Sequence, residues 1–600
     1  MELIAIESKS GGLHSYAKEE ISAFANHLNY CLGDDSDLDY LMPINPDTND
    51  LFTKVKDGVM IAKFINVIEP ETIDWRAVNY KKGGGLNQFK IIENQNLNLS
   101  AAKSIGTCVL PMVWTKQKKG LRVQNQSAEE LRDAEKNPTL VLGFMWQAVK
   151  MQLLGSINLK AHPELIRLLQ DGEEMNDLLA LPPEEILKRW VNYHLAKENY
   201  PKRINNFGTD IKDAKVYTVL LKSISGGKCD ADPLNWGDTN KRAQKVLDNA
   251  SAIGEFFSVK PLSSANVFIK AKDIVDGNEK LNLAFTAQLF NTAPALEPLK
   301  EEEQKELAGL MDDDAGDSRE ERAFRMWINT LGIGDLYINN LFEDCKDGLT
   351  LLKVIDKIEP GTVLWKKVEM KPNNKFKKLG NCNYAVVLGK QLKLSLVTTG
   401  GSDIVDGNKK LLLGFTWQLM RYHMLKFLAN LARGGKQVTD EDILSWGNET
   451  VSKSGKKSSI KSFQDPSISS GVFFIDLLAA VEPKIVDWGL VTEGMTDEDK
   501  MLNARYAISI ARKLGAIIFL LPEDIVEVRP KMCLTFVAGV MAEALRTKKN
   551  LSVLWKFQFS FTIGDVEFIV AMLFQQHGSC AVIGENIISF AYSYFNLITT

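Results

Sequence analysis

The most informative stretch of this sequence is DGVMIAKFINVIEPETIDW, residues 57–75, because its pattern recurs at fixed spacing. Ten residues separate Asp-Gly from Glu-Pro, and four more separate Glu-Pro from Trp. The same spacing returns in residues 347–365 and, with Ser-Gly in place of Asp-Gly, in residues 470–488. A weaker copy begins at residues 213–214 and reaches Trp236 with extra residues between. Self-similarity at a domain-sized period predicts four copies of one module.

The repeated stretch is predicted to form a buried helix with a defined end. The segment after each Asp-Gly is apolar nearly throughout, as in residues 59–62, and a helix that is apolar all round is buried. The Glu-Pro that follows predicts the helix end, because proline cannot continue the hydrogen-bond ladder and restricts the residue before it. We interpret the Trp that comes next as a packing residue.

Each module also carries an opening helix and a closing helix. In the opening helix of the third module, apolar residues recur at helical spacing from Phe324 to Leu331. A Trp-x-Asn pattern marks this helix in three modules, while His27 and Asn29 stand there in the first. We interpret these Trp residues as core anchors. The closing helix carries Leu-Gly-Phe followed by Gln, at residues 142–147 and 413–418.

These patterns predict an all-α protein of four domains, and 600 residues are enough for four cores. A short segment, residues 1–14, precedes them. An acidic linker at residues 294–318 separates the second domain from the third, so the domains form two pairs. The predicted domain boundaries are 15–156, 180–293, 319–428 and 436–547.

Composition excludes several classes of protein. The net charge of −4 provides no basic field for nucleic acid. No stretch of about 20 apolar residues predicts a membrane span, and the N-terminus does not resemble a signal peptide. Seven scattered cysteines without CxxC pairs indicate reduced thiols in a cytosolic protein. We therefore expect a cytoplasmic monomer.

Catalytic and metal-binding motifs are not found in the sequence. It has no phosphate-binding G-x-x-x-x-G-K-[ST], no G-x-S-x-G and no H-E-x-x-H. The six histidines are scattered and make no metal-ligand spacing. We predict neither an enzyme nor a metal or cofactor site, and a repeated module of this kind is typical of a binding protein.

The repeats resemble a known family. The Trp-x-Asn opening helix, the Asp-Gly helix ending in Glu-Pro and the Leu-Gly-Phe-x-x-Gln closing helix resemble the calponin-homology domain. Four such domains in two pairs resemble the core of the fimbrin (plastin) family. The resemblance extends to connecting stretches such as residues 205–215, 381–391 and 521–532, and covers residues 15–547. It implies a protein that cross-links actin filaments into bundles.

Three features depart from the family pattern. Fimbrins usually carry two EF-hands before the first domain, whereas about 14 residues precede it here. Asp35, Asp37 and Asp39 begin like a calcium loop, but Tyr40 stands where Gly is needed, so direct calcium control is not expected. His27 replaces the Trp of the first opening helix, a change expected to loosen that core. Residues 109–127 interrupt the first pair.

The resemblance also implies where actin would bind. Two sites on one short chain can bridge two filaments, because binding of the first raises the effective concentration of the second. When the family's actin-binding surfaces are carried over to the matching motifs, they fall on Phe24–Leu32 and Leu140–Leu153 in the first pair. In the second pair they fall on Phe324–Leu331 and Asn408–Leu425. Cationic positions suit acidic actin. The candidate contacts are Lys150, Lys409, Lys410, Arg421 and His423, and the alternative for each is a solvated helix face.

Two alternatives stay open at this stage. The first alternative is a cross-linker. The second is a side-binding or scaffold protein on a single filament, in which one pair of domains binds actin and the other pair regulates that binding or binds another partner. The tail, residues 548–600, has no repeat signature. One interpretation is a helix that binds a membrane surface or a protein partner. The other is an irregular product of the gene model.

Overall fold

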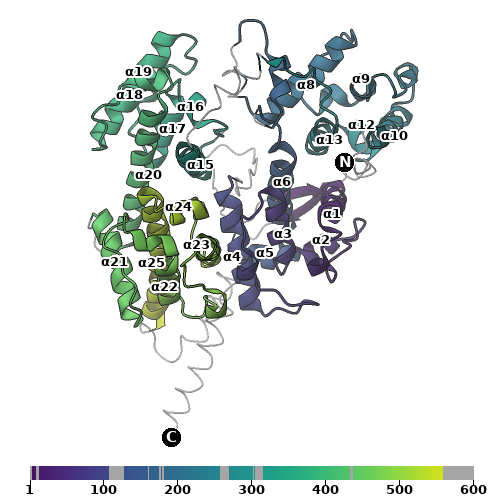
Figure 1. Ribbon diagram of the computed structural model, residues 1–600. Coiled ribbons are helices and arrows are strands. Elements are labelled where there is room, and N and C mark those ends of the chain that lie inside the picture. Colours follow the sequence, from purple (N-terminus) through teal and green to yellow (C-terminus); the bar gives the residue numbers. More distant parts are fainter. Residues whose placement is uncertain are drawn as a thin grey trace.

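In the part of the chain that it describes, the structure, a computed structural model, is helical apart from one N-terminal hairpin (Figure 1). Strands β1 (Leu3–Glu7) and β2 (Leu13–Ala17) pair antiparallel, with Leu3 opposite Ala17. Among the described residues, no helix is both long and apolar enough to cross a membrane. The structure describes residues 3–7, 13–106, 127–159, 161–173, 178, 181–256, 269–301, 303, 315–334, 336–432 and 437–558.

The helices fall into four similar sets that confirm the all-α prediction. The first set comprises α1 (Lys18–Leu32), α2 (Asp50–Lys54), α3 (Val59–Ile68), α4 (Gln88–Ser104), α5 (Ala128–Arg132) and α6 (Pro138–Leu154). The second comprises α8 (Pro183–Lys197), α9 (Lys215–Ile224), α10 (Thr239–Phe256), α12 (Ala271–Asp276) and α13 (Glu279–Thr292). The third comprises α15 (Ala315–Thr330), α16 (Leu341–Asp344), α17 (Leu349–Ile358), α18 (Lys375–Gln391), α19 (Gly401–Val405) and α20 (Lys409–Leu431). The fourth comprises α21 (Asp440–Lys453), α22 (Val472–Val481), α23 (Asp497–Lys513), α24 (Pro522–Val526) and α25 (Pro530–Gln558).

The repeated Asp-Gly stretch forms the predicted buried helix in every set. Helices α3, α17 and α22 are each ten residues long, and each ends at the residue before Glu-Pro. Each begins after a glycine in the left-handed region, with φ of 78° at Gly58, 77° at Gly348 and 72° at Gly471. In the second set Ala214 takes this place at φ 55°, a conformation that a Cβ disfavours. The glycine therefore fixes the start of the helix.

A buried asparagine on the next helix holds this turn in place. Asn94 of α4 donates to the carbonyls of Asp57 and Asn79, both at 2.9 Å, and accepts the Asn79 N–H at 2.9 Å. Asn381 of α18 makes the same three bonds to Asp347 and Glu369. Asn503 of α23 makes them to Ser470 and Thr492. We call each of these three-bond arrangements an asparagine clamp.

The second set replaces the asparagine clamp with an arginine. Arg242 of α10 is 3% exposed and donates to the carbonyl of Asp213 at 2.6 Å and to that of Pro233 at 2.8 Å, with a further bond to the carbonyl of Trp236. Arg242 reaches further than asparagine. The weak copy of the repeat has extra residues between this turn and Trp236.

The Trp that ends each repeat lies partly at the surface. Trp236 and Trp488 are 37% and 42% exposed, so the prediction of a packing residue holds only in part. In two of the repeats a lysine covers the ring: Lys63 Nζ lies 3.9 Å from the Trp75 ring centroid, and Lys456 Nζ lies 3.4 Å from that of Trp488. These cation–π contacts cap the end of the repeat.

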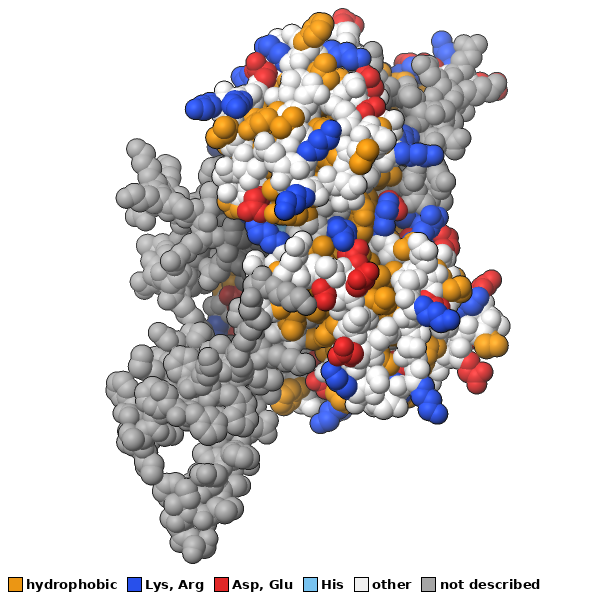
Figure 2. Space-filling view, turned by 90° about the vertical axis from the view of Figure 1, so that its left-hand side faces the viewer, with side chains coloured by type: hydrophobic (Ala, Val, Ile, Leu, Met, Phe, Trp, Pro, Cys, Tyr) orange, Lys and Arg blue, Asp and Glu red, His pale blue; other side chains and the backbone are white. Residues whose placement is uncertain are grey.

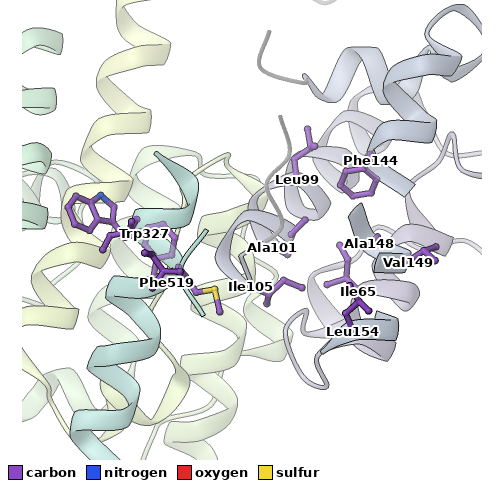
Figure 3. Packing of buried hydrophobic residues seen from close by; sticks show 14 of the residues in the cluster. Ile65, Leu99, Ala101, Ile105, Phe144, Ala148, Val149, Leu154, Trp327 and Phe519 are labelled. Atoms are coloured by element: carbon purple, nitrogen blue, oxygen red, sulfur yellow. The ribbon is translucent and has the colours of Figure 1, made fainter. Parts of the chain in front are cut away.

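The first and fourth sets pack against each other through equivalent helices, α4 and α23 (Figure 1). Ile105, just after α4, lies between Phe519 on one side and the first core on the other (Figure 3). Arg512 of α23 is 3% exposed, and donates to Thr72 O at 2.6 Å and Ile518 O at 2.9 Å. Burial, with a smaller effect of nearby Arg322, lowers the pKa of Arg512 to about 9. Among the described residues, its hydrogen-bond partners are these two carbonyls.

The predicted linker begins as an ordered segment. Pro294 O accepts the indole N–H of Trp190 at 2.8 Å, and Glu303 pairs with Arg167 at 2.7 Å. Residues 304–314 lie outside the described residues. Most of the 109–127 insertion and residues 559–600 of the tail also lie outside them, while α25 continues to Gln558, beyond the predicted domain end at 547.

The asparagine clamp predicts a large stability effect from one side chain. Asn381→Ala leaves two buried carbonyls and one buried N–H unpaired, and we expect it to destabilise the third set by about 2–4 kcal/mol. Urea unfolding of the full chain, followed by tryptophan fluorescence, measures the loss. Asn373→Ala, at an exposed loop position, serves as the matched control. Equal unfolding midpoints for the two variants would contradict the role of the clamp.

Candidate functional site

The four predicted actin-facing stretches lie mostly inside the molecule. In Phe24–Leu32 only Tyr30 is exposed, and in Leu140–Leu153 and Phe324–Leu331 no residue is. In Asn408–Leu425 only Asn408 and Lys410 are exposed. The opening and closing helices of the odd-numbered modules thus form the core of each pair more than its surface.

Two of the predicted contact residues join neighbouring modules. Lys150 of α6 forms an ion pair with Glu184 in the first turn of α8. Arg421 of α20 pairs with Asp440 in the first turn of α21, its Nε 3.0 Å from both carboxylate oxygens. Each cation stands three residues after the Gln of its closing helix, so the two occupy equivalent positions. Both pairs are partly exposed, and each contributes about 1 kcal/mol or less.

His423 accepts a hydrogen bond inside the third module. The indole N–H of Trp327 donates to His423 Nδ1 at 3.3 Å, which requires that nitrogen to be unprotonated. Burial, and to a smaller extent Lys426 and Lys357, lower the pKa of His423. His423 is therefore neutral at physiological pH and presents no positive charge.

In the first module both residues of this contact are replaced by others. His27 stands at the Trp327 position and is 3% exposed, with its ring edge-on to Phe64 at a centroid distance of 5.7 Å. Gln152 stands at the His423 position and partly offsets the effect of burial, which lowers the pKa of His27 to about 3. A smaller ring thus takes the place of the indole in the first module.

The remaining two candidates lie at the start of α20. The ammonium of Lys409 lies 5.6 Å from the Phe342 ring centroid. Lys410 is exposed, and no ion pair involves it among the described residues. The Asn408 side chain caps the helix by accepting the Leu411 N–H. Of the five candidates, Lys410 is therefore the most accessible to a partner.

Metal binding finds no support in the described part of the chain. No group of three or more His, Cys, Asp or Glu side chains there is placed to hold an ion. The buried thiols of Cys345, Cys382 and Cys533 have pKa values raised by burial, which keeps them protonated.

Comparison with known proteins identifies the module and the family. The calponin homology (CH) domain model matches residues 18–152, 181–295, 318–425 and 437–545. The chain is 44% identical over 543 residues to Fimbrin-3 of Arabidopsis thaliana, covering 90% of this chain and 72% of that protein. It is 42% identical over 555 residues to Plastin-3 of Rattus norvegicus, covering 90% and 82%.

A solved structure extends this similarity to three dimensions. The crystal structure of the actin-crosslinking core of Schizosaccharomyces pombe fimbrin matches with a TM-score of 0.71 at 39% identity. The match covers 88% of this chain and all of that one. The fold and the repeated sites define a protein of four tandem CH domains. The chain belongs to the fimbrin/plastin family, and proteins of this family are not enzymes. We call its modules CH1 to CH4.

The Trp327–His423 contact predicts a pH effect on stability. The pKa of His423 is lowered in the folded state, so the unfolded state binds more protons once the pH falls below about 6.5. Stability conferred by this group is present above that pH and is lost as the pH falls, with a slope of at most about 1.4 kcal/mol per pH unit. His423→Gln, which copies Gln152 of CH1, should remove this component. Thermal midpoints between pH 7.5 and pH 5.5 (about the range where histidine titrates) measure it. If the thermal midpoints of wild type and His423→Gln changed equally with pH, His423 would not be the source of this pH dependence.

Proposed function

We propose that this protein cross-links actin filaments, with CH1–CH2 binding one filament and CH3–CH4 binding another. The observation that carries the proposal is the repetition of one paired unit. Lys150–Glu184 and Arg421–Asp440 join the two domains of each pair at equivalent positions. One chain therefore presents two copies of the same two-domain unit, which is the requirement for bridging two filaments.

We further propose that the five candidate cations divide into two roles. Lys410, and beside it Lys409, contacts the acidic filament surface and accelerates association. Lys150 and Arg421 set the angle between the domains of each pair, and His423 supports the opening helix α15 through Trp327. The protein acts as a monomer in the cytoplasmic actin cytoskeleton, with F-actin as its partner and without a cofactor.

A second candidate function is side binding to a single filament. It is favoured by the difference between the pairs, because CH3–CH4 exposes Asn408 and Lys410 while the equivalent stretch of CH1–CH2 exposes no residue. In that case CH3–CH4 binds actin and CH1–CH2 regulates it or binds another partner.

Sedimentation with F-actin separates the two functions. A cross-linker brings filaments down at low speed, because bundles are heavy, whereas a side binder pellets with filaments only at high speed. We expect low-speed pelleting by the full chain. The separate fragments 15–293 and 319–547 should bind filaments without bundling them. High-speed pelleting alone by the full chain would support the side-binding function instead.

Charge reversal at Lys410 tests the contact surface. Lys410→Glu places a negative charge against an acidic partner, and we expect filament affinity of the full chain to fall about tenfold, most strongly at low salt. Lys484→Glu makes the same charge change at an exposed position of CH4 outside the predicted surface, and should leave affinity unchanged. High-speed co-sedimentation measures both. Equal affinities would remove Lys410 from the site.

A further inference from the structure

One face of CH3 is strongly basic in a chain whose net charge is −4. It comprises the loop around Trp365 and helix α18, residues 361–393, and we call it the CH3 lysine face. One acidic residue, Glu369, and no arginine occur in this stretch. Its eight lysines are Lys366, Lys367, Lys371, Lys375, Lys377, Lys378, Lys390 and Lys393.

Most of this charge is not neutralised within the protein. Lys375 pairs with Asp406 at 2.7 Å, and Lys377 pairs with Glu369 at 3.3 Å. No ion pair among the described residues involves the five other exposed lysines, which are Lys366, Lys367, Lys371, Lys390 and Lys393. These lysines create a positive local potential, which attracts a negatively charged surface over a distance of about 10 Å.

Large apolar side chains project from between these lysines. Phe376, the second residue of α18, is 85% exposed. Met370 is 54% exposed, Val387 50% and Leu364 46%. The upper half of Figure 2, over CH3, shows hydrophobic side chains interspersed with Lys and Arg. Isolated apolar side chains projecting from a basic surface are suited to insertion into the headgroup region of a lipid bilayer.

The equivalent stretches of the other domains carry less of this combination: in CH1 Phe89 is 50% exposed, but the exposed lysines near it are only Lys81, Lys82 and Lys90. In CH1 and CH4, α4 and α23 cover each other (Figure 1). The start of α10 in CH2 carries mixed charges, with Lys241 and Asp248 both exposed. Among the described residues, α18 packs mainly against α17 and α19 of its own domain. The basic, apolar face is exposed there, as the exposed side chains of Phe376 and Lys371 show.

We propose that the CH3 lysine face binds anionic lipid membranes, with the lysines at the phosphate and carboxylate headgroups and Phe376 inserted between them. Charge complementarity and projecting apolar groups favour a membrane over a protein partner. Protein interfaces are enriched in arginine and depleted in lysine, whereas all eight cations here are lysines. This inference does not depend on the proposed actin binding.

Vesicle flotation of the full chain tests the proposal. Wild type should float with phosphatidylcholine vesicles that contain phosphatidylserine, and not with phosphatidylcholine alone. Each lysine near an anionic surface strengthens partitioning about fivefold, so Lys366→Gln, Lys367→Gln and Lys371→Gln together should weaken it on the order of 100-fold. Phe376→Ser should weaken it about tenfold. All four positions are exposed, and an unchanged thermal midpoint verifies folding of each variant.

CH1 offers a matched control for these variants. Phe89 is the second residue of α4, as Phe376 is of α18, and Lys81 and Lys82 lie in the equivalent loop. Lys81→Gln, Lys82→Gln and Phe89→Ser should leave flotation unchanged. Absence of wild-type flotation, or unchanged flotation of the CH3 variants, would overturn the proposal. Loss of F-actin co-sedimentation with unchanged flotation would instead assign this face to the filament site.

Discussion

The buried asparagine of the third long helix is the constraint on which each complete CH domain depends. The turn before the buried helix directs a carbonyl against the next helix, and a carbonyl left there without a donor destabilises the fold. Asn94, Asn381 and Asn503 supply that donor and at the same time hold the loop that follows the Trp. One side chain thus joins three segments. In CH2 the longer Arg242 does the same.

The helix that carries the clamp also organises the molecule at the next level. In α23 the inner side holds Asn503, while Arg512, further along, donates to Thr72 of CH1. Because α4 and α23 are equivalent helices, CH1 and CH4 meet through the same element of the repeat. In CH3 the equivalent α18 packs mainly against α17 and α19 of its own domain, and Phe376 at its start is 85% exposed. One repeated helix therefore has different surroundings in different copies.

The architecture was accessible to sequence reasoning, whereas the environment of single side chains was not. The buried helix after Asp-Gly and its Glu-Pro stop are local properties, and both were predicted at their positions, whereas the left-handed glycine at the helix start was seen only in the structure. The equivalence of Lys150 and Arg421 was also visible, since each lies three residues after the Gln of its helix. Their acidic partners lie 34 residues away in one pair and 19 in the other, and no local pattern connects them.

Periodicity and turn chemistry act over a few residues, so the amino-acid order alone specified four helical modules, their pairing along the chain and their family. Which faces those modules present to solvent depended on contacts between segments far apart in the chain. The burial of Phe324–Leu331, the neutral state of His423 and the exposure of Lys410 all followed from packing in three dimensions. Burial and the distance between charges are properties of assembled surfaces, and the folded arrangement determined both.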